Sequence, residues 1–129
     1  MLEREPSRTA LAAAAHRAAH QILEQGRIFA DPLAVTILGE QAQAAAKTSE
    51  AQPSTRGIRL FIAARSRIAE SALAAGVETR GVRQLVVLGA GLDTFAYRNP
   101  FADRLAVFEV DHPETQAWKR RRLAETGMA

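Results

Sequence analysis

Two short strand-like runs, the apolar residues 85–88 and the mainly apolar residues 106–110, stand out in the hydrophobic pattern of this chain of 129 residues. The first run contains no polar position, which predicts a β-strand that is buried on both faces. It leads directly into the turn Gly89-Ala90-Gly91, and the second run ends at Asp111. A glycine turn after one strand and an acidic residue after the next are typical of an open α/β sheet that binds an adenosine-containing cofactor.

Apolar positions at helical spacing predict three helices before the first strand. The first helix should begin with a cap at Ser7 or Thr9 and end at Gly26. A short second helix should begin after Asp31, because this acidic cap is followed by a proline, which favours the first helical turn. Gly39 should end the second helix.

A third helix is expected from about residue 56 to residue 75, with Gly76 as its stop. Arg65 falls within the apolar stripe of this helix, so its guanidinium group must find an anion or extend to water. The flanking segments, residues 40–55 and residues 77–84, are polar and are expected to be connectors, the first of them mobile. The apolar stripe comprises Ile58, Phe61, Ile62, Ile68, Ala69, Ala72 and Leu73.

Charge is mild and mostly dispersed along the chain. After the second strand, Pro113 should begin a last helix that ends at Gly127. The basic run at residues 119–122 lies near the end of that helix, where the helix dipole favours cations, and we interpret it as a solvated helix end. The other basic residues are scattered and the net charge is only +3, so no nucleic-acid partner is expected.

Composition narrows the classes of protein further. Cysteine is absent, which excludes a disulfide framework, a thiolate zinc site and a cysteine nucleophile. No apolar run approaches the roughly 20 residues of a membrane span, so no membrane partner is expected. The lack of cysteine fits a reducing compartment, and the charged N-terminus lacks a signal-peptide core, so the expected location is the cytoplasm.

The glycine turn alone leaves the ligand open. A dinucleotide fingerprint would place a third glycine at Thr94, three residues after Gly91, and its absence weakens the nicotinamide interpretation. Gly89 and Gly91 carry no Cβ, so the backbone either approaches a ligand closely there or only forms a turn. Asp111 either accepts hydrogen bonds from both hydroxyls of a ribose or caps the helix that begins at Pro113.

The histidines give no catalytic or metal assignment. His16 and His20 are one helical turn apart, which is a metal-ligand spacing, but no third ligand is recognisable and no metal is expected. His112 lies beside the predicted site, and a histidine between a strand end and a helix start is interpreted as structural rather than catalytic. No catalytic residue is assigned.

Motifs along nearly the whole chain match one known family in order and spacing. They are SRTA (7–10), FADPLA (29–34), ARSR (64–67), LGAGLDT (88–94), AYR (96–98), FEVDHP (108–113) and QAWK (116–119). On these motifs the chain resembles the leucine carboxyl methyltransferase-like family. More narrowly, it is similar to the bacterial branch of S-adenosylmethionine-dependent methyltransferases within that family.

The resemblance implies a fold class and an activity. The fold would be α/β, a partial Rossmann-like class I methyltransferase domain with an N-terminal helical cover. Residues 1–76 would form the helical region, and residues 77–129 the first half of the S-adenosylmethionine-binding domain. The implied reaction is O-methyl transfer to a small-molecule or carboxylate acceptor.

The resemblance also implies a set of cofactor-binding residues. Gly89 and Gly91, with Ala90 between them, would line the methionine end of S-adenosylmethionine. Asp111 would hold the ribose. Arg65 would reach the carboxylate of the cofactor, which supplies the anion that an arginine within an apolar stripe needs.

Two features depart from the family and leave other classes open. Phe95 stands where the family usually has an arginine. Family members also continue through further strands, whereas this chain ends soon after its second strand. One alternative is a non-catalytic remnant or interaction piece that associates with itself through an uncovered sheet edge. The other is a fragment of an NAD(P)-dependent oxidoreductase.

Overall fold

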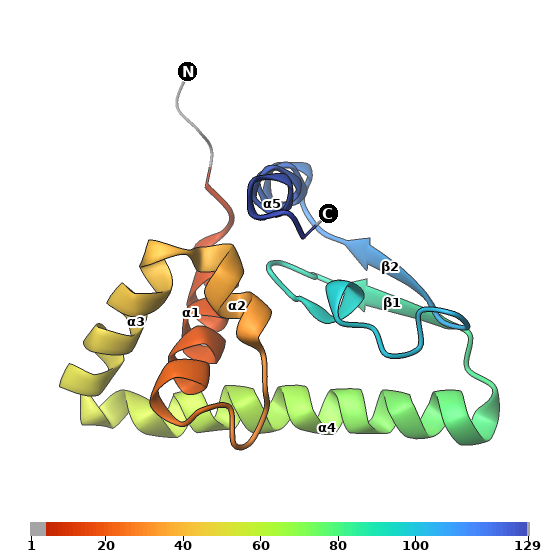
Figure 1. Ribbon diagram of the computed structural model, residues 1–129, viewed down its shortest axis with the longest axis horizontal. Coiled ribbons are helices and arrows are strands. Elements are labelled where there is room, and N and C mark those ends of the chain that lie inside the picture. Colours follow the sequence, from red (N-terminus) through yellow and green to blue (C-terminus); the bar gives the residue numbers. More distant parts are fainter. Residues whose placement is uncertain (1–4, 129) are drawn as a thin grey trace.

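A computed structural model describes residues 5–128. The described residues form a mixed α/β structure in which three helices gather over one half of a long fourth helix, as Figure 1 shows. Two parallel strands lie over its other half, and the last helix lies on the side away from it. The elements are α1 (Arg8–Leu23), α2 (Pro32–Leu38), α3 (Glu40–Ala51), η1 (Pro53–Thr55), α4 (Arg56–Arg80), β1 (Gln84–Leu88), η2 (Phe95–Tyr97), β2 (Ala106–Val110) and α5 (Pro113–Thr126).

The predicted starts of the first two helices are confirmed. The Ser7 hydroxyl accepts a hydrogen bond from the backbone N–H of Ala10 at 3.2 Å and so caps α1. Asp31 caps α2 in the same way through the backbone N–H of Ala34. The alanine-rich face of α1 packs closely against α2 and α3, because alanine lets helices approach one another, and α5 joins the same cluster through Leu123. This cluster comprises Ala14, Ala18, Ala34, Ile37, Leu38, Ala42, Leu92 and Leu123.

The prediction of a mobile connector over residues 40–55 is wrong, because this segment forms α3 and η1. Ala42, Ala46 and Ser49 are buried and follow one another at helical spacing. Their side chains are small or polar, so they form a weak hydrophobic stripe in the sequence. That stripe nevertheless packs, because α1 presents an equally shallow face to it.

Helix α4 extends beyond its predicted end at Gly76. It continues to Arg80 and ends at Gly81, which has the left-handed φ of 65° that a helix-terminating glycine adopts. Gly76 lies inside the helix, where a Cβ would come within 3.1 Å of the Val82 side chain. The glycine at this position therefore serves close packing against Val82 rather than helix termination. Helix α4 also runs across the boundary predicted between residues 76 and 77.

The face of α4 that packs also differs from the predicted stripe. Ile58, Phe61 and Ile68 are each more than half exposed, while Ile62 is buried. Arg59 is buried beside Ile62 because its guanidinium group has polar partners. A polar residue therefore occupies the packed face, and three large apolar residues lie outside it.

Arg59 joins α4 to the end of α1 and to α3. It donates two hydrogen bonds to the Glu24 carboxylate, both at 2.9 Å, and one to the Ser49 hydroxyl at 2.6 Å. His20 also bonds to Glu24. Partial burial opposes the ionised form of Glu24, but the hydrogen bonds from Arg59 and His20 outweigh it and lower the pKa of this carboxyl.

The two strands match the predicted runs and pair in parallel, with Val86 opposite Phe108 and Leu88 opposite Val110. The prediction that the first strand is buried on both faces is wrong within the described residues. Exposed and partly buried positions alternate along both strands. Val86, Leu88, Phe108 and Val110 share one face of the sheet, and each is more than half exposed.

The basic run on α5 is only partly solvated, which corrects the prediction for residues 119–122. Lys119 is buried, and its ammonium group lies 2.8 and 2.9 Å from the two carboxylate oxygens of Glu109. Arg122 donates to the backbone carbonyl of Ile37 at 2.8 Å and so connects α5 to α2. Arg120 and Arg121 are exposed, as expected.

Candidate functional site

The glycine turn after β1 is fastened to the end of β2. The N–H groups of Gly89 and Ala90 donate to the carbonyl of Val110 at 2.8 and 3.1 Å. The N–H of Gly91 donates to the Asp111 carboxylate at 2.5 Å. Gly89 and Gly91 have φ angles of 63° and 52°, which glycine adopts without strain. The turn and Asp111 therefore form one local unit.

The alternative role for Asp111, as the cap of the last helix, is not observed. His112 is the N-cap of α5, and its Nδ1 accepts a hydrogen bond from the backbone N–H of Glu114 at 3.2 Å. The second carboxylate oxygen of Asp111 instead accepts from the N–H of His112 at 2.6 Å. His112 therefore has a structural role, as the sequence predicted.

A cleft of about 640 Å³ lies beside the turn. This volume is within the range of small-molecule sites. Its walls come from the start of α1, the middle of α4, strand β1 and the glycine turn. The five residues predicted to bind a cofactor all line it: Arg65, Gly89, Ala90, Gly91 and Asp111. The fold thus brings residues that are up to 46 positions apart in the chain, from Arg65 to Asp111, to one concave surface.

Two features leave room for a ligand in this cleft. Arg65 is exposed and has no hydrogen bond or ion pair to any residue that the structure describes. A Cβ at Gly89 would meet no other atom within 4 Å, so open space adjoins the turn there. A Cβ at Gly91, by contrast, would lie 3.0 Å from the Cβ of Ala10, so α1 closes over that side of the turn.

Most backbone N–H groups of the turn are not free to form the anion site that a dinucleotide requires. The pyrophosphate of a dinucleotide binds free N–H groups at the start of an α-helix. Here the N–H groups of Gly89, Ala90, Gly91 and Asp93 already have acceptors in the protein. The turn continues into the three-residue η2 rather than an α-helix. This geometry does not favour the nicotinamide alternative.

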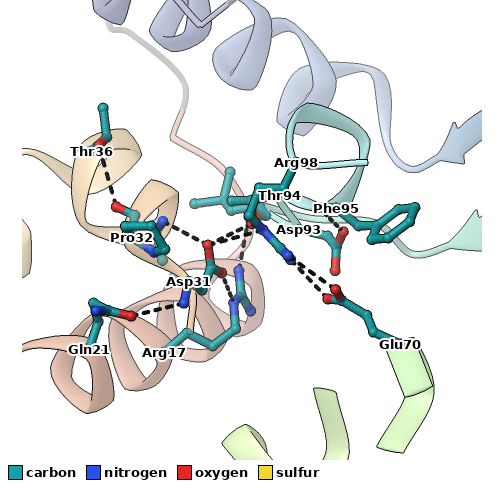
Figure 2. A network of polar contacts seen from close by, with 12 residues as sticks. Arg17, Gln21, Asp31, Pro32, Thr36, Glu70, Asp93, Thr94, Phe95 and Arg98 are labelled. Carbon is teal, nitrogen blue, oxygen red and sulfur yellow. Dashed lines mark hydrogen bonds and ion pairs between the residues drawn. The ribbon is translucent and has the colours of Figure 1, made fainter. Parts of the chain in front are cut away.

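A buried polar network lies directly behind the turn, and the sequence did not predict it. Figure 2 shows its centre, Asp31, whose side chain is 1% exposed. The Asp31 carboxylate accepts hydrogen bonds from Arg17 at 3.1 Å, from the Thr94 hydroxyl at 2.7 Å and from the backbone N–H of Ala34 at 3.1 Å. The residue predicted only as a helix cap therefore also anchors the glycine loop.

Arg17 and Arg98 extend this network on its two sides (Figure 2). Arg17 donates to the carbonyl of Leu92 at 2.9 Å and so holds the residue that follows Gly91. Arg98 donates to Thr94 at 2.8 Å and to both carboxylate oxygens of Glu70 on α4, at 3.1 and 2.8 Å. Burial opposes the charged form of Arg98, but the hydrogen bonds and negative charge of Glu70 outweigh it and raise its pKa.

Phe95 occupies a packing position. It is buried with Val77, Phe101 and Leu105 between the sheet and α4. It also contributes to the wall of the cleft. An apolar ring therefore lies where the family usually has an arginine, and it stabilises the contact between the turn and α4.

Within residues 5–128, no group of three or more His, Asp or Glu side chains is arranged to hold a metal ion. His20 is buried and fully engaged, since its Nδ1 bonds to Glu24 and its Nε2 accepts from the backbone N–H groups of Ile28 and Phe29. No helix in this same range is both long and apolar enough to cross a membrane.

Comparison with known proteins assigns the chain to a family. The sequence profile of leucine carboxyl methyltransferases matches residues 10–129. The chain therefore belongs to the leucine carboxyl methyltransferase family, as its motifs predicted.

Individual relatives agree with this assignment. A protein of Mycolicibacterium paratuberculosis is 34% identical over 133 aligned positions, which cover 92% of this chain and 41% of the relative. One from Mycobacterium sp. strain KMS is 38% identical over 106 positions, covering 75% and 40%. YktD of Bacillus subtilis is 51% identical over 49 positions, covering 37% and 16%. All three carry the name "Putative S-adenosyl-L-methionine-dependent methyltransferase". The chain spans about 40% of the length of the first two relatives.

Proposed function

We propose that this chain is the cofactor-binding N-terminal part of an S-adenosylmethionine-dependent methyltransferase. The observation that carries the proposal is that all five motif residues line one and the same cleft. Family membership and the names of the relatives support the same cofactor. When bound, S-adenosylmethionine supplies a methyl group on a sulfonium centre.

The residues of the cleft fit the parts of this cofactor. The unpaired guanidinium group of Arg65 suits the carboxylate of the methionine part. The carboxylate of Asp111 suits the ribose hydroxyls, because its position beside Gly91 keeps it at the mouth of the turn. The open space at Gly89 lets the ligand approach the backbone. The parallel strand pair, with the turn at its carboxyl end, supports a partial Rossmann-like class I arrangement.

For the methyl acceptor, the proposal is limited to its chemical class. We propose O-methyl transfer to a small molecule or a carboxylate, for which positioning in line with the methyl group supplies much of the rate. In this scheme residues 1–76 cover the cofactor, and residues 77–129 form the first half of the domain that binds it. A cytoplasmic location stays a prediction from composition. No residue of this chain is assigned a catalytic role.

The uncovered face of the sheet suggests a second property. Val86, Leu88, Phe108 and Val110 form a continuous apolar face on paired strands, and such faces are usually covered in α/β proteins. We propose that the isolated 129-residue chain associates with itself through this face and the neighbouring strand edges. Sedimentation velocity at increasing concentration would detect the association, and a monomer at all concentrations would contradict it.

Calorimetric titration with S-adenosylmethionine tests the main proposal. The chain should bind this cofactor saturably and should bind NAD far more weakly. The variant Asp111→Asn should lose roughly ten- to a hundredfold in affinity, because a charge-assisted pair of hydrogen bonds to the ribose is removed. The variant Asp103→Asn is the matched control, since Asp103 is exposed and lies outside the cleft.

The outcomes separate the alternatives. A folded chain that binds neither compound would contradict cofactor binding and favour the non-catalytic alternative. Preference for NAD would favour the oxidoreductase alternative. If the Asp111 and Asp103 variants changed the affinity for S-adenosylmethionine equally, Asp111 would not belong to the site, but the cofactor assignment would still hold.

A further inference from the structure

The cleft has two walls that come from different parts of the fold. Arg65 projects from α4, whereas the glycine turn and Asp111 belong to the sheet. A ligand that contacts both walls requires a fixed separation between them. Whatever holds the middle of α4 against the turn therefore controls the geometry of the whole site.

Apolar packing holds α4 toward its two ends, and toward its C-terminal end Leu73 and Ala74 join the cluster that contains Phe95. The buried residues of α4 are Arg59, Ile62 and Ala63 toward the start, and Gly76 and Val77 toward the end. The nine residues from 64 to 72, between these two packed ends, include none that is buried. This middle stretch contains Arg65 and lines the cleft.

Polar contacts replace apolar packing in the middle stretch. Arg67 donates to the carbonyl of Ile28 at 3.2 Å, which ties α4 to the loop after α1. The pair of Glu70 and Arg98, hereafter the Glu70–Arg98 clamp, instead ties α4 to the segment that follows the turn. Its two parallel hydrogen bonds fix direction as well as distance. Figure 2 shows the clamp continuing through Thr94 to Asp31.

We infer that Glu70 is a positioning residue, which sets the separation between α4 and the glycine turn and thereby places Arg65 against the ligand. The inference rests on the proposed cofactor site. Glu70 follows Arg65 by five residues on the same helix, about 7.5 Å along its axis, so a displacement at one residue moves the other. The guanidinium group of Arg98 is itself held by Thr94 and by the ring of Phe29, 5.2 Å away, so the clamp has a rigid base.

A distance measurement tests the clamp without any ligand. The sequence has no cysteine, so Ile68→Cys and Ala102→Cys provide two exposed sites for spin labels, one on α4 and one in the loop after Arg98. Glu70→Gln should broaden or shift the distribution of distances between the labels. Glu78→Gln, an exposed change on the same helix, should leave it unaltered. An unaltered distribution in Glu70→Gln would overturn the inference.

A double-mutant cycle tests whether the clamp acts through Arg65. In the parent chain, Glu70→Gln should weaken S-adenosylmethionine binding by roughly tenfold, a typical size for coupled residues. In an Arg65→Met background, where the positioned group is missing, the same change should alter affinity less than about twofold. An equal loss in both backgrounds would mean that Glu70 contacts the ligand directly, which would overturn the positioning role. If the parent chain binds no S-adenosylmethionine, the proposed function fails, and the label distances alone decide the inference about the clamp.

Discussion

Replacing Asp31 with asparagine should destabilise the whole fold, because this side chain joins α1, α2 and the glycine loop. Asparagine has nearly the same shape and keeps one carbonyl oxygen, so the hydrogen bonds from Ala34 and Thr94 can persist. The other carboxylate oxygen becomes an NH2 group that faces the donating Nε of Arg17. The substitution thus removes the negative charge beside the buried guanidinium group of Arg17, and it places the new NH2 group against the N–H of that guanidinium, so that two donors face each other.

The magnitude follows from burial. Arg17 is 8% exposed and Asp31 is 1% exposed, so water cannot replace the lost partner. Removing one partner of a buried ion pair costs about 3–5 kcal/mol. Arg17 keeps its hydrogen bond to the Leu92 carbonyl, which places the expected loss near the lower end, about 3 kcal/mol. A domain of this size has only about 5–15 kcal/mol of stability in total.

Urea unfolding followed by circular dichroism measures this loss. With a slope of roughly 1.5 kcal/mol per molar urea, the midpoint should fall by about 2 M. Asp103→Asn is the matched control, because Asp103 is exposed and its replacement should change stability by less than about 0.5 kcal/mol. If Asp31→Asn lost less than about 1 kcal/mol, the network would not anchor the loop and the assignment of Asp31 as its centre would be wrong.

Three further predictions follow from single side chains. Because the folded structure lowers the pKa of Glu24, the ionised carboxylate stabilises the fold above its ordinary pKa of about 4.5, and this stabilisation is lost as the pH falls through the lower pKa of the folded state. In Glu24→Gln the urea midpoint should therefore fall less steeply between about pH 5 and pH 3 than in the parent chain. Parallel curves for the two proteins would contradict this. Lys119→Met should lower stability by about 1–3 kcal/mol, because it leaves the largely buried Glu109 carboxylate without its cation. The exposed Arg120→Met should have little effect, and equal thermal midpoints for the two variants would refute the buried pair. Gly89→Ala should lower the free energy of unfolding by about 1 kcal/mol, because residue 89 has a left-handed φ, and the added methyl group meets no other protein atom. The loss of binding free energy for S-adenosylmethionine should be larger than this loss of stability, which calorimetry and urea unfolding of one preparation would show. An unchanged affinity would place the ligand away from the turn.

Elements with strong local signals were predictable from the sequence. Strand β2 has its predicted bounds, and β1 begins one residue earlier than the run at 85–88. The caps at Ser7 and Asp31 act through hydrogen bonds within three residues, so the sequence contains all that they need. The gathering of Arg65, the turn and Asp111 at one cleft followed from family motifs rather than from periodicity.

Elements that depend on a distant partner were not predictable in this way. Helix α3 has only alanine and serine on its packed face. These small side chains bury enough surface to hold the helix only because α1 presents an equally flat face to them. The sequence predicted Gly76 as a helix stop, yet its φ is not left-handed, and it is a glycine because the Val82 side chain leaves little room for a Cβ. The buried Lys119 depends on Glu109 from the neighbouring strand, which a charge pattern along one helix does not reveal.

The separation between partners in the buried network has a consequence for how the chain folds during synthesis. Asp31 bonds to a hydroxyl 63 residues later, and Arg17 bonds to a carbonyl 75 residues later. At about 5–20 residues per second, a ribosome takes several seconds to supply those partners. Until then Asp31 lacks the Thr94 hydroxyl and Arg17 lacks the Leu92 carbonyl. We therefore expect the N-terminal helices and the glycine loop to reach their final structure together, after Arg98 has emerged.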